Sequence, residues 1–165
     1  MIHRVVVIVS LLATASGGRV LAQRAPDLNA ERAALRGLFD HMATALCAGD
    51  WAAYQDTWAH DSTVERLDAA NGSWLTGWAA LSKFYQSTMP KIRGCRFELT
   101  KLTLHISQDA TIAWGVSEGR LHMSDTTMAP TILWGAFGFE KRAGAWKMVL
   151  DHSAVRVSRG AGRGP

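Results

Sequence analysis

Apolar positions in the first part of the chain recur at helical spacing. Between about Ala30 and Ala48, steps of three and four residues predict one amphipathic helix. The apolar stripe consists of Leu35, Leu38, Phe39, Met42 and Leu46. Asp27 or Asn29 is suited to cap the start of this helix. Gly49 is expected just past its end, because glycine tolerates the left-handed backbone found there.

Two shorter helices are expected next. Asp50 is placed to cap a helix over Trp51–Trp58. A third helix should cover Trp78–Met89, with its apolar side facing inward. That side consists of Leu81, Phe84 and Tyr85. Pro90 is expected to end the third helix, because proline lacks the amide hydrogen that a helix interior requires.

The second half of the chain alternates between apolar and polar residues, which is typical of strands. The expected strands are Thr63–Leu67, Ser73–Thr76, Arg96–Ser107, Ala110–Met123 and the two halves of Thr131–Val157. The last two form a hairpin around Glu140–Gly144, a polar run that ends in glycine. Helices followed by antiparallel strands favour an α+β fold, with about three N-terminal helices on one face of a strongly curved, mostly antiparallel sheet.

The last strand carries the polar residues of most interest. In a regular strand, alternate side chains point to opposite faces. One face would present Trp146, Met148, Leu150 and His152, and the other Lys147, Val149, Asp151 and Ser153. Asp151 and His152 would then point in opposite directions and could not form an Asp–His dyad.

The chain resembles a known family at two places. Gly144 and Trp146, followed by aliphatic residues and then His152-Ser153, resemble the SnoaL-like branch of the NTF2-like superfamily, as does the run Ala48–Trp51. The resemblance implies an NTF2-like cone over residues 30–157, in which helices and a curved sheet enclose a pocket. Relatives commonly dimerise through the sheet, so a homodimer is expected.

The resemblance is incomplete in the strand before the hairpin turn. Relatives usually carry an R-x-T sequence twelve residues before the tryptophan. Here Trp134 stands in place of the arginine and Ala136 in place of the threonine. A pocket that lacks this arginine should be more apolar and aromatic.

The N-terminus has the features of a secretory signal. A basic start at Arg4 and an apolar run over Val5–Ala15 precede small residues that predict cleavage after Ala22. An uncleaved N-terminal anchor is the alternative. Residues 23–29 would form a leader, and the Gly/Arg-rich residues 158–165 a disordered tail. The mature protein is then expected to be periplasmic or secreted, with no membrane association after cleavage.

Charge and cysteine content add two constraints. The chain has 18 basic and 14 acidic residues, and removal of Arg4 and Arg19 leaves 16 against 14, a net charge of +2. No basic stripe with interleaved aromatic residues occurs, which excludes nucleic acid as an expected partner. Cys47 and Cys95 could form a disulfide in an oxidising compartment, or could remain two separate thiols.

Tryptophan and a few polar residues supply the candidate chemistry. The chain has seven tryptophans, each of which could be core packing or pocket wall. The residues predicted to bind ligand are Trp58, Trp78, Trp114, Trp134 and His152, and the catalytic candidates are His152, Glu118, Asp56 and Tyr54. The histidine spacing suits no metal site, and no cofactor is expected.

Three functions follow from these residues and the resemblance. The first is an exported protein that binds a small apolar or aromatic molecule in its cone. The second is a cofactor-independent isomerase, dehydratase or cyclase that uses a pocket carboxylate or histidine as acid and base. The third is a homodimeric interaction domain without small-molecule chemistry. Whether the protein is an enzyme stays open.

Overall fold

The computed structural model describes residues 25–69 and 72–156, and within them the chain forms three helices and six strands. In chain order, these are α1 Leu28–Ala48, α2 Trp51–Gln55, β1 Glu65–Asp68, β2 Ser73–Thr76, α3 Trp78–Ile92, β3 Arg96–Ile106, β4 Ile112–His122, β5 Thr131–Arg142 and β6 Ala145–Arg156. The predicted signal peptide and tail lie outside the described residues. None of the helices in the described part is long and apolar enough to cross a membrane.

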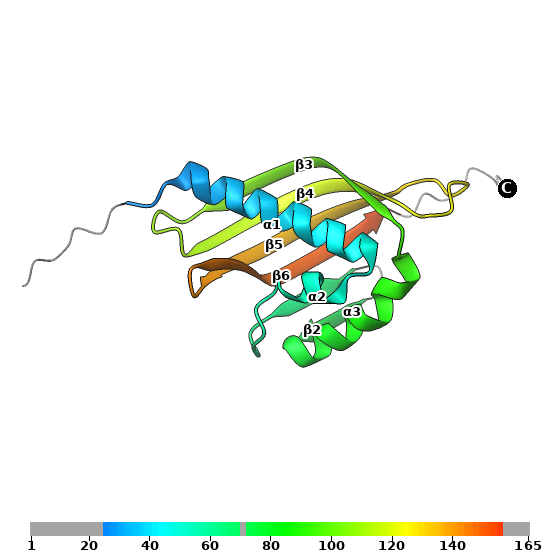
Figure 1. The fold of residues 1–165 in the computed structure, drawn as a ribbon, viewed down its shortest axis with the longest axis horizontal. Coiled ribbons are helices and arrows are strands. Elements are labelled where there is room, and N and C mark those ends of the chain that lie inside the picture. Colours follow the sequence, from blue (N-terminus) through cyan, green and yellow to red (C-terminus); the bar gives the residue numbers. More distant parts are fainter. Residues whose placement is uncertain (1–24, 70–71, 157–165) are drawn as a thin grey trace, which may run out of the picture.

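The six strands form one sheet in the order β2-β1-β6-β5-β4-β3. All neighbours are antiparallel except β1 and β6, which are parallel. α1 runs across one face of the sheet, and α2 and α3 lie toward the edge formed by β2 (Figure 1). The expected α+β architecture is confirmed, with helices on one face of a curved, mostly antiparallel sheet.

The helix ends follow local sequence signals, with two exceptions: α2 ends at Gln55 instead of the expected Trp58, and α3 continues past Pro90. Asp27 caps α1 by accepting hydrogen bonds from two backbone amides, and Gly49 ends it with a φ of 72°. Asp50 caps α2 by accepting a hydrogen bond from the backbone amide of Ala53. The prediction for Pro90 is wrong, because α3 continues to Ile92. A proline in the last turn removes only one hydrogen bond, and its fixed φ suits a helix.

The β5–β6 hairpin closes through a tight turn. Ala143 and Gly144 both have positive φ, 49° and 84°. Two such residues between antiparallel strands match the twist of the sheet. The glycine supplies this backbone freely, and the alanine adopts it under the constraint of the two long flanking strands.

The predicted regular alternation of β6 is wrong. Gly138 pairs with Leu150 but Phe139 pairs with Met148, so Val149 is an extra residue in a β-bulge. The bulge lies where β6 changes neighbour: Met148 bonds through its backbone to Thr57 and Ala59, and Leu150 is the first residue opposite β1. Beyond the bulge the faces are exchanged relative to those expected.

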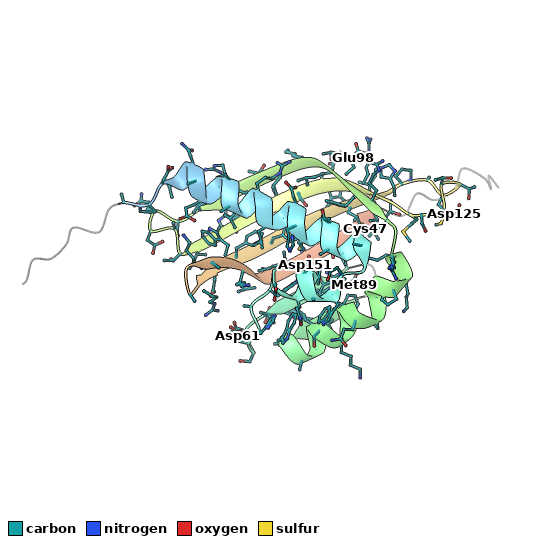
Figure 2. The ribbon with its side chains drawn as sticks, viewed as in Figure 1. Cys47, Asp61, Met89, Glu98, Asp125 and Asp151 are labelled. Atoms are coloured by element: carbon teal, nitrogen blue, oxygen red, sulfur yellow. A yellow bond between two sulfur atoms is a disulfide. The ribbon has the colours of Figure 1, made fainter. Side chains whose placement is uncertain are left out.

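A disulfide joins the end of α1 to the start of β3. Cys47 and Cys95 are bonded, with their Cα atoms 4.8 Å apart, and Cys47 is marked at the end of α1 in Figure 2. The backbone N–H of Gly94 also donates to the carbonyl of Cys47 at 2.7 Å. Of the two arrangements left open by the sequence, the structure contains the disulfide.

Candidate functional site

A cavity of about 560 Å³ lies between α1, α3 and the helix-covered face of the sheet. Its wall is mainly apolar and aromatic. The apolar lining residues include Phe39, Met42, Leu46, Phe84, Ile92, Phe97, Leu121, Leu133, Phe137 and Val155. A hollow of this size and composition is typical of a small-molecule site.

The space exists because β4 and β5 present small residues to the helices. Gly115, Ser117 and Gly119 point inward from β4, and Gly135 does so from β5. A Cβ atom at Gly119 would overlap the ring of Phe97, and one at Gly135 would overlap Phe137. The tips of the two rings therefore occupy the space that side chains at these glycines would need.

A buried polar cluster forms one end of the cavity. It consists of Arg66, Asp68, Tyr85 and Asp151. Because β1 and β6 are parallel and in register, Arg66 lies directly opposite Asp151. Arg66 Nη1 donates to Asp151 Oδ2 and, at 2.8 Å, to the hydroxyl of Tyr85. That hydroxyl in turn donates to Asp151 Oδ2 at 2.9 Å.

A second nitrogen of the guanidinium group is also held, whereas Arg66 Nε is buried without a hydrogen-bond partner in the described part of the chain. Arg66 Nη2 lies 3.4 Å from Asp68 Oδ2, and the group stacks over the rings of Phe84 and Tyr85 at 4.9 and 5.2 Å. Asp151 is only 5% exposed and lies on the face that the helices cover (Figure 2). One of its oxygens, Oδ1, is buried without a hydrogen-bond partner among the described residues. An unsatisfied buried carboxylate oxygen is costly, so its presence beside a cavity points to a missing donor.

Two tyrosines keep their protons at this end of the cavity. Burial raises the pKa of Tyr54 well above its ordinary value of 10.0. Burial also raises the pKa of Tyr85, although the charge of Arg66 opposes part of that rise. Both hydroxyl groups are therefore donors at neutral pH.

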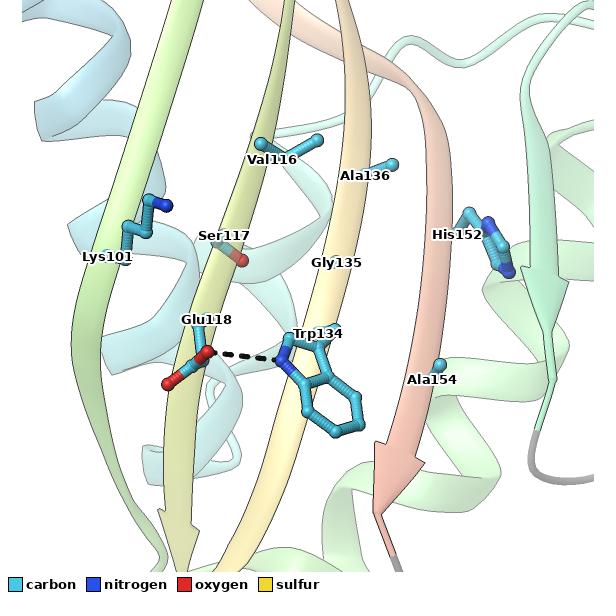
Figure 3. A pocket seen from close by; sticks show the side chains of 9 residues that line it. All are labelled: Lys101, Val116, Ser117, Glu118, Trp134, Gly135, Ala136, His152 and Ala154. Atoms are coloured by element: carbon cyan, nitrogen blue, oxygen red, sulfur yellow. Dashed lines mark hydrogen bonds between the residues drawn. The ribbon is translucent and has the colours of Figure 1, made fainter.

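The strongest catalytic candidates from the sequence lie on the other face of the sheet. Glu118, Trp134 and His152 line an outer groove of about 330 Å³, and the helices lie behind the sheet in this view (Figure 3). Trp134, which was predicted to bind ligand, also belongs to the lining of the interior cavity. The indole N–H of Trp134 donates to Glu118 Oε2 at 3.2 Å. His152 lies in the outer groove because the bulge at Val149 turns its side chain outward and turns that of Asp151 toward the helices.

The other predicted site residues are dispersed. Trp114 is half exposed on the outer face and stacks on His105 at 3.9 Å. Trp78 stacks between Trp51 and His60 near the surface. The remaining three are Trp58, which is buried in the core, Asp56, which is exposed at the end of α2, and Tyr54, which lines the cavity. Tyr54 is thus the predicted catalytic candidate whose side chain the structure places at the cavity.

Sequence reasoning missed the polar cluster. Arg66 and Asp68 are two residues apart on β1, and this spacing alone could have indicated a shared face. Asp151 carried no such signal, because the bulge hides its orientation. The expectation of a pocket without an arginine is corrected: Trp134 and Ala136 replace the R-x-T residues on the outer face, and Arg66 supplies a guanidinium group from β1.

Two further kinds of chemistry find no support in this geometry. The run Gly115–Gly119 (GVSEG) has the spacing of a nucleophile elbow, but it lies inside the regular strand β4 instead of a strand-to-helix turn. Ser117 therefore lacks the exposed position that a serine nucleophile requires. In the described part of the chain, no cluster of histidine, cysteine or acidic residues is suited to hold a metal ion.

Comparison with known proteins gives a consistent result for the fold. The sequence profile of the SnoaL-like domain matches residues 35–158. No protein of curated function matches the chain. An NTF2-like protein of unknown function from Pseudomonas putida is similar with a TM-score of 0.69 and 19% identity, over 81% of this chain and 92% of that one.

Two similar structures carry enzyme names. A proposed dehydratase of the NTF2-like family from Streptomyces avermitilis has a TM-score of 0.70 and 13% identity, over 80% of this chain and 100% of that one. A proposed scytalone dehydratase from Novosphingobium aromaticivorans has a TM-score of 0.65 and 18% identity, over 79% of this chain and 87% of that one. At these identities the likeness shows the shared fold and carries no site residue across.

Proposed function

The chain belongs to the SnoaL-like domain family, and from this premise we propose that it binds a small, largely apolar or aromatic molecule in its interior cavity. The observation that carries the proposal is the cavity of about 560 Å³ itself, with a mainly apolar and aromatic wall and the buried polar cluster at one end; Ser87, Thr88 and Lys91 also belong to its lining. Apolar walls supply affinity through burial, and a few fixed polar groups supply orientation.

A second candidate is cofactor-independent proton transfer, as in an isomerase, dehydratase or cyclase. The specific support is the contact of 2.9 Å between the hydroxyl of Tyr85 and Asp151 at the cavity wall. A carboxylate beside a protonated phenol can remove a proton next to a carbonyl while a hydroxyl donor stabilises the oxyanion that develops. Because Glu118 and His152 lie on the outer face, this role falls to Asp151.

Export and dimerisation complete the proposal. A disulfide between Cys47 and Cys95 is consistent with an oxidising compartment, and the N-terminal signal would direct the chain there. The outer face of the sheet exposes large apolar residues, which supports a homodimer through this face. These residues are Ile112, Trp114, Val116, Trp134 and Leu150.

A pair of matched substitutions tests the binding site. Ala43→Phe fills the cavity from α1, whereas Ala136→Phe adds the same ring to the outer groove. Binding of naphthalene, measured by titration calorimetry, is expected to be lost in Ala43→Phe and retained in Ala136→Phe. Native mass spectrometry of protein purified from an oxidising export compartment should reveal a retained small molecule. Equal binding by both variants would contradict an interior site.

A further inference from the structure

We propose that the cavity selects a neutral ligand whose hydroxyl group donates to Asp151, and that it rejects anions despite its buried arginine. This inference rests on the proposed function, because it names the chemical class of the molecule that the cavity takes. A lone guanidinium group in an apolar pocket normally indicates an anionic ligand. The contacts of Arg66 argue against that interpretation.

The charge of Arg66 is already matched within the protein. Its guanidinium group contacts two carboxylates, Asp151 and Asp68, and both of them border the cavity. An anionic ligand that approached Arg66 would meet both carboxylates at close range. Like charges brought together in a desolvated site repel strongly, so this end of the cavity disfavours an anion. Lys91, which also lines the cavity, is exposed.

Two buried polar atoms of the cluster lack a hydrogen-bond partner in the part of the chain that the structure describes: the acceptor Asp151 Oδ1 and the donor Arg66 Nε. Asp151 Oδ2 receives hydrogen bonds from Arg66 and Tyr85, whereas the buried Oδ1 receives none among the described residues. Asp151 borders the cavity, so a donor carried by the ligand can satisfy this oxygen. A hydrogen bond to a buried carboxylate is among the stronger kinds, because the acceptor is charged.

A hydroxyl group suits this acceptor better than an ammonium group does. A cationic ligand would have to lose its hydration and lie beside the guanidinium group of Arg66, and both steps are unfavourable. A neutral hydroxyl is desolvated at much lower cost and leaves the charge balance of the cluster unchanged. The remainder of such a ligand would contact the aromatic wall, including Phe97 and Phe137.

Three probes of one shape test the inference. Naphthalene, 2-naphthol and 2-naphthoate differ only in having no polar group, a neutral donor or an anion at pH 7. Calorimetric titration should show 2-naphthol binding about tenfold or more tighter than naphthalene, the gain expected from one hydrogen bond to a charged acceptor. 2-Naphthol should also bind at least about tenfold tighter than 2-naphthoate.

The variant Asp151→Asn removes one of the two carboxylates beside Arg66. Its preference for 2-naphthol over 2-naphthoate should fall by about tenfold, because the arginine is then less fully neutralised. Asp125→Asn is the matched control, since Asp125 is exposed in the loop between β4 and β5 and makes local hydrogen bonds with Thr127. This control should retain the wild-type preference.

The outcomes separate this inference from the function on which it rests. If naphthalene binds and 2-naphthoate binds as tightly as 2-naphthol, the cavity takes ligands but the inference is overturned. If none of the three probes binds, the proposed function itself is contradicted. The wild-type comparison decides the inference even if Asp151→Asn does not fold.

Discussion

Loss of the Cys47–Cys95 disulfide is expected to cost about 4 kcal/mol of unfolding free energy. The bond spans 48 residues, and closing a loop of that length in the unfolded chain accounts for a stabilisation of about 4 kcal/mol. A domain of this size has a total stability of about 5–15 kcal/mol. The bond therefore supplies a large share of it, and protein retained in a reducing compartment would keep only about 1–11 kcal/mol.

Urea denaturation of oxidised and reduced protein measures this contribution. With a slope of about 2 kcal/mol per molar urea, the midpoint should fall by about 2 M on reduction. The double variant Cys47→Ala, Cys95→Ala should match the reduced wild type and should not respond further to reductant. This variant controls for reductant effects elsewhere in the assay.

The result that would refute the reasoning is a midpoint shift below about 0.5 M in both the reduced protein and the double variant. It would mean that the unfolded chain is already constrained near these residues, or that the two thiols do not bond in solution. A shift in the double variant without one on reduction would instead indicate that the alanines damage packing around Cys47, which is buried.

Three further predictions concern the polar cluster, the acid limit of stability and the cavity floor. Arg66→Met should lower the unfolding free energy by about 3–5 kcal/mol in urea titrations, because it removes the cation that contacts the buried carboxylate of Asp151; a loss below about 1 kcal/mol would contradict the cluster. The hydrogen bond from Lys141 lowers the pKa of Glu31 below its ordinary 4.5, so the stability that Glu31 contributes should be complete above pH 4.5 and be lost as pH falls through the lower folded value. Thermal unfolding of Glu31→Gln should lack this acid-dependent component, and an unchanged pH profile would refute it. Gly119→Val should destabilise the protein by about 1–3 kcal/mol, because its side chain would overlap Phe97; unaltered thermal unfolding would show that the ring can move aside.

Local features of the structure could be predicted from the sequence. The stripe on α1, the Asp27 cap and the Gly49 terminus all depend on residues within a few positions of one another. The same holds for the β5–β6 hairpin, where alternation and a glycine-containing turn lie in one continuous stretch. Short-range spacing, together with the order of the elements, was enough to indicate an α+β fold with helices on one face of the sheet.

The site depended on contacts between residues far apart in the chain. Arg66 meets Asp151 because β1 pairs in parallel with β6, and this pairing joins segments that are 85 positions apart. The bulge at Val149 arises where β6 exchanges one neighbour for another, so no local pattern marks it. That one extra residue turned His152 outward and Asp151 into the cavity. The sequence by itself determined which segments become helices and strands, because their periodicity is local; only tertiary pairing decided which side chains face the cavity, because a shift of one residue reverses the faces of a strand.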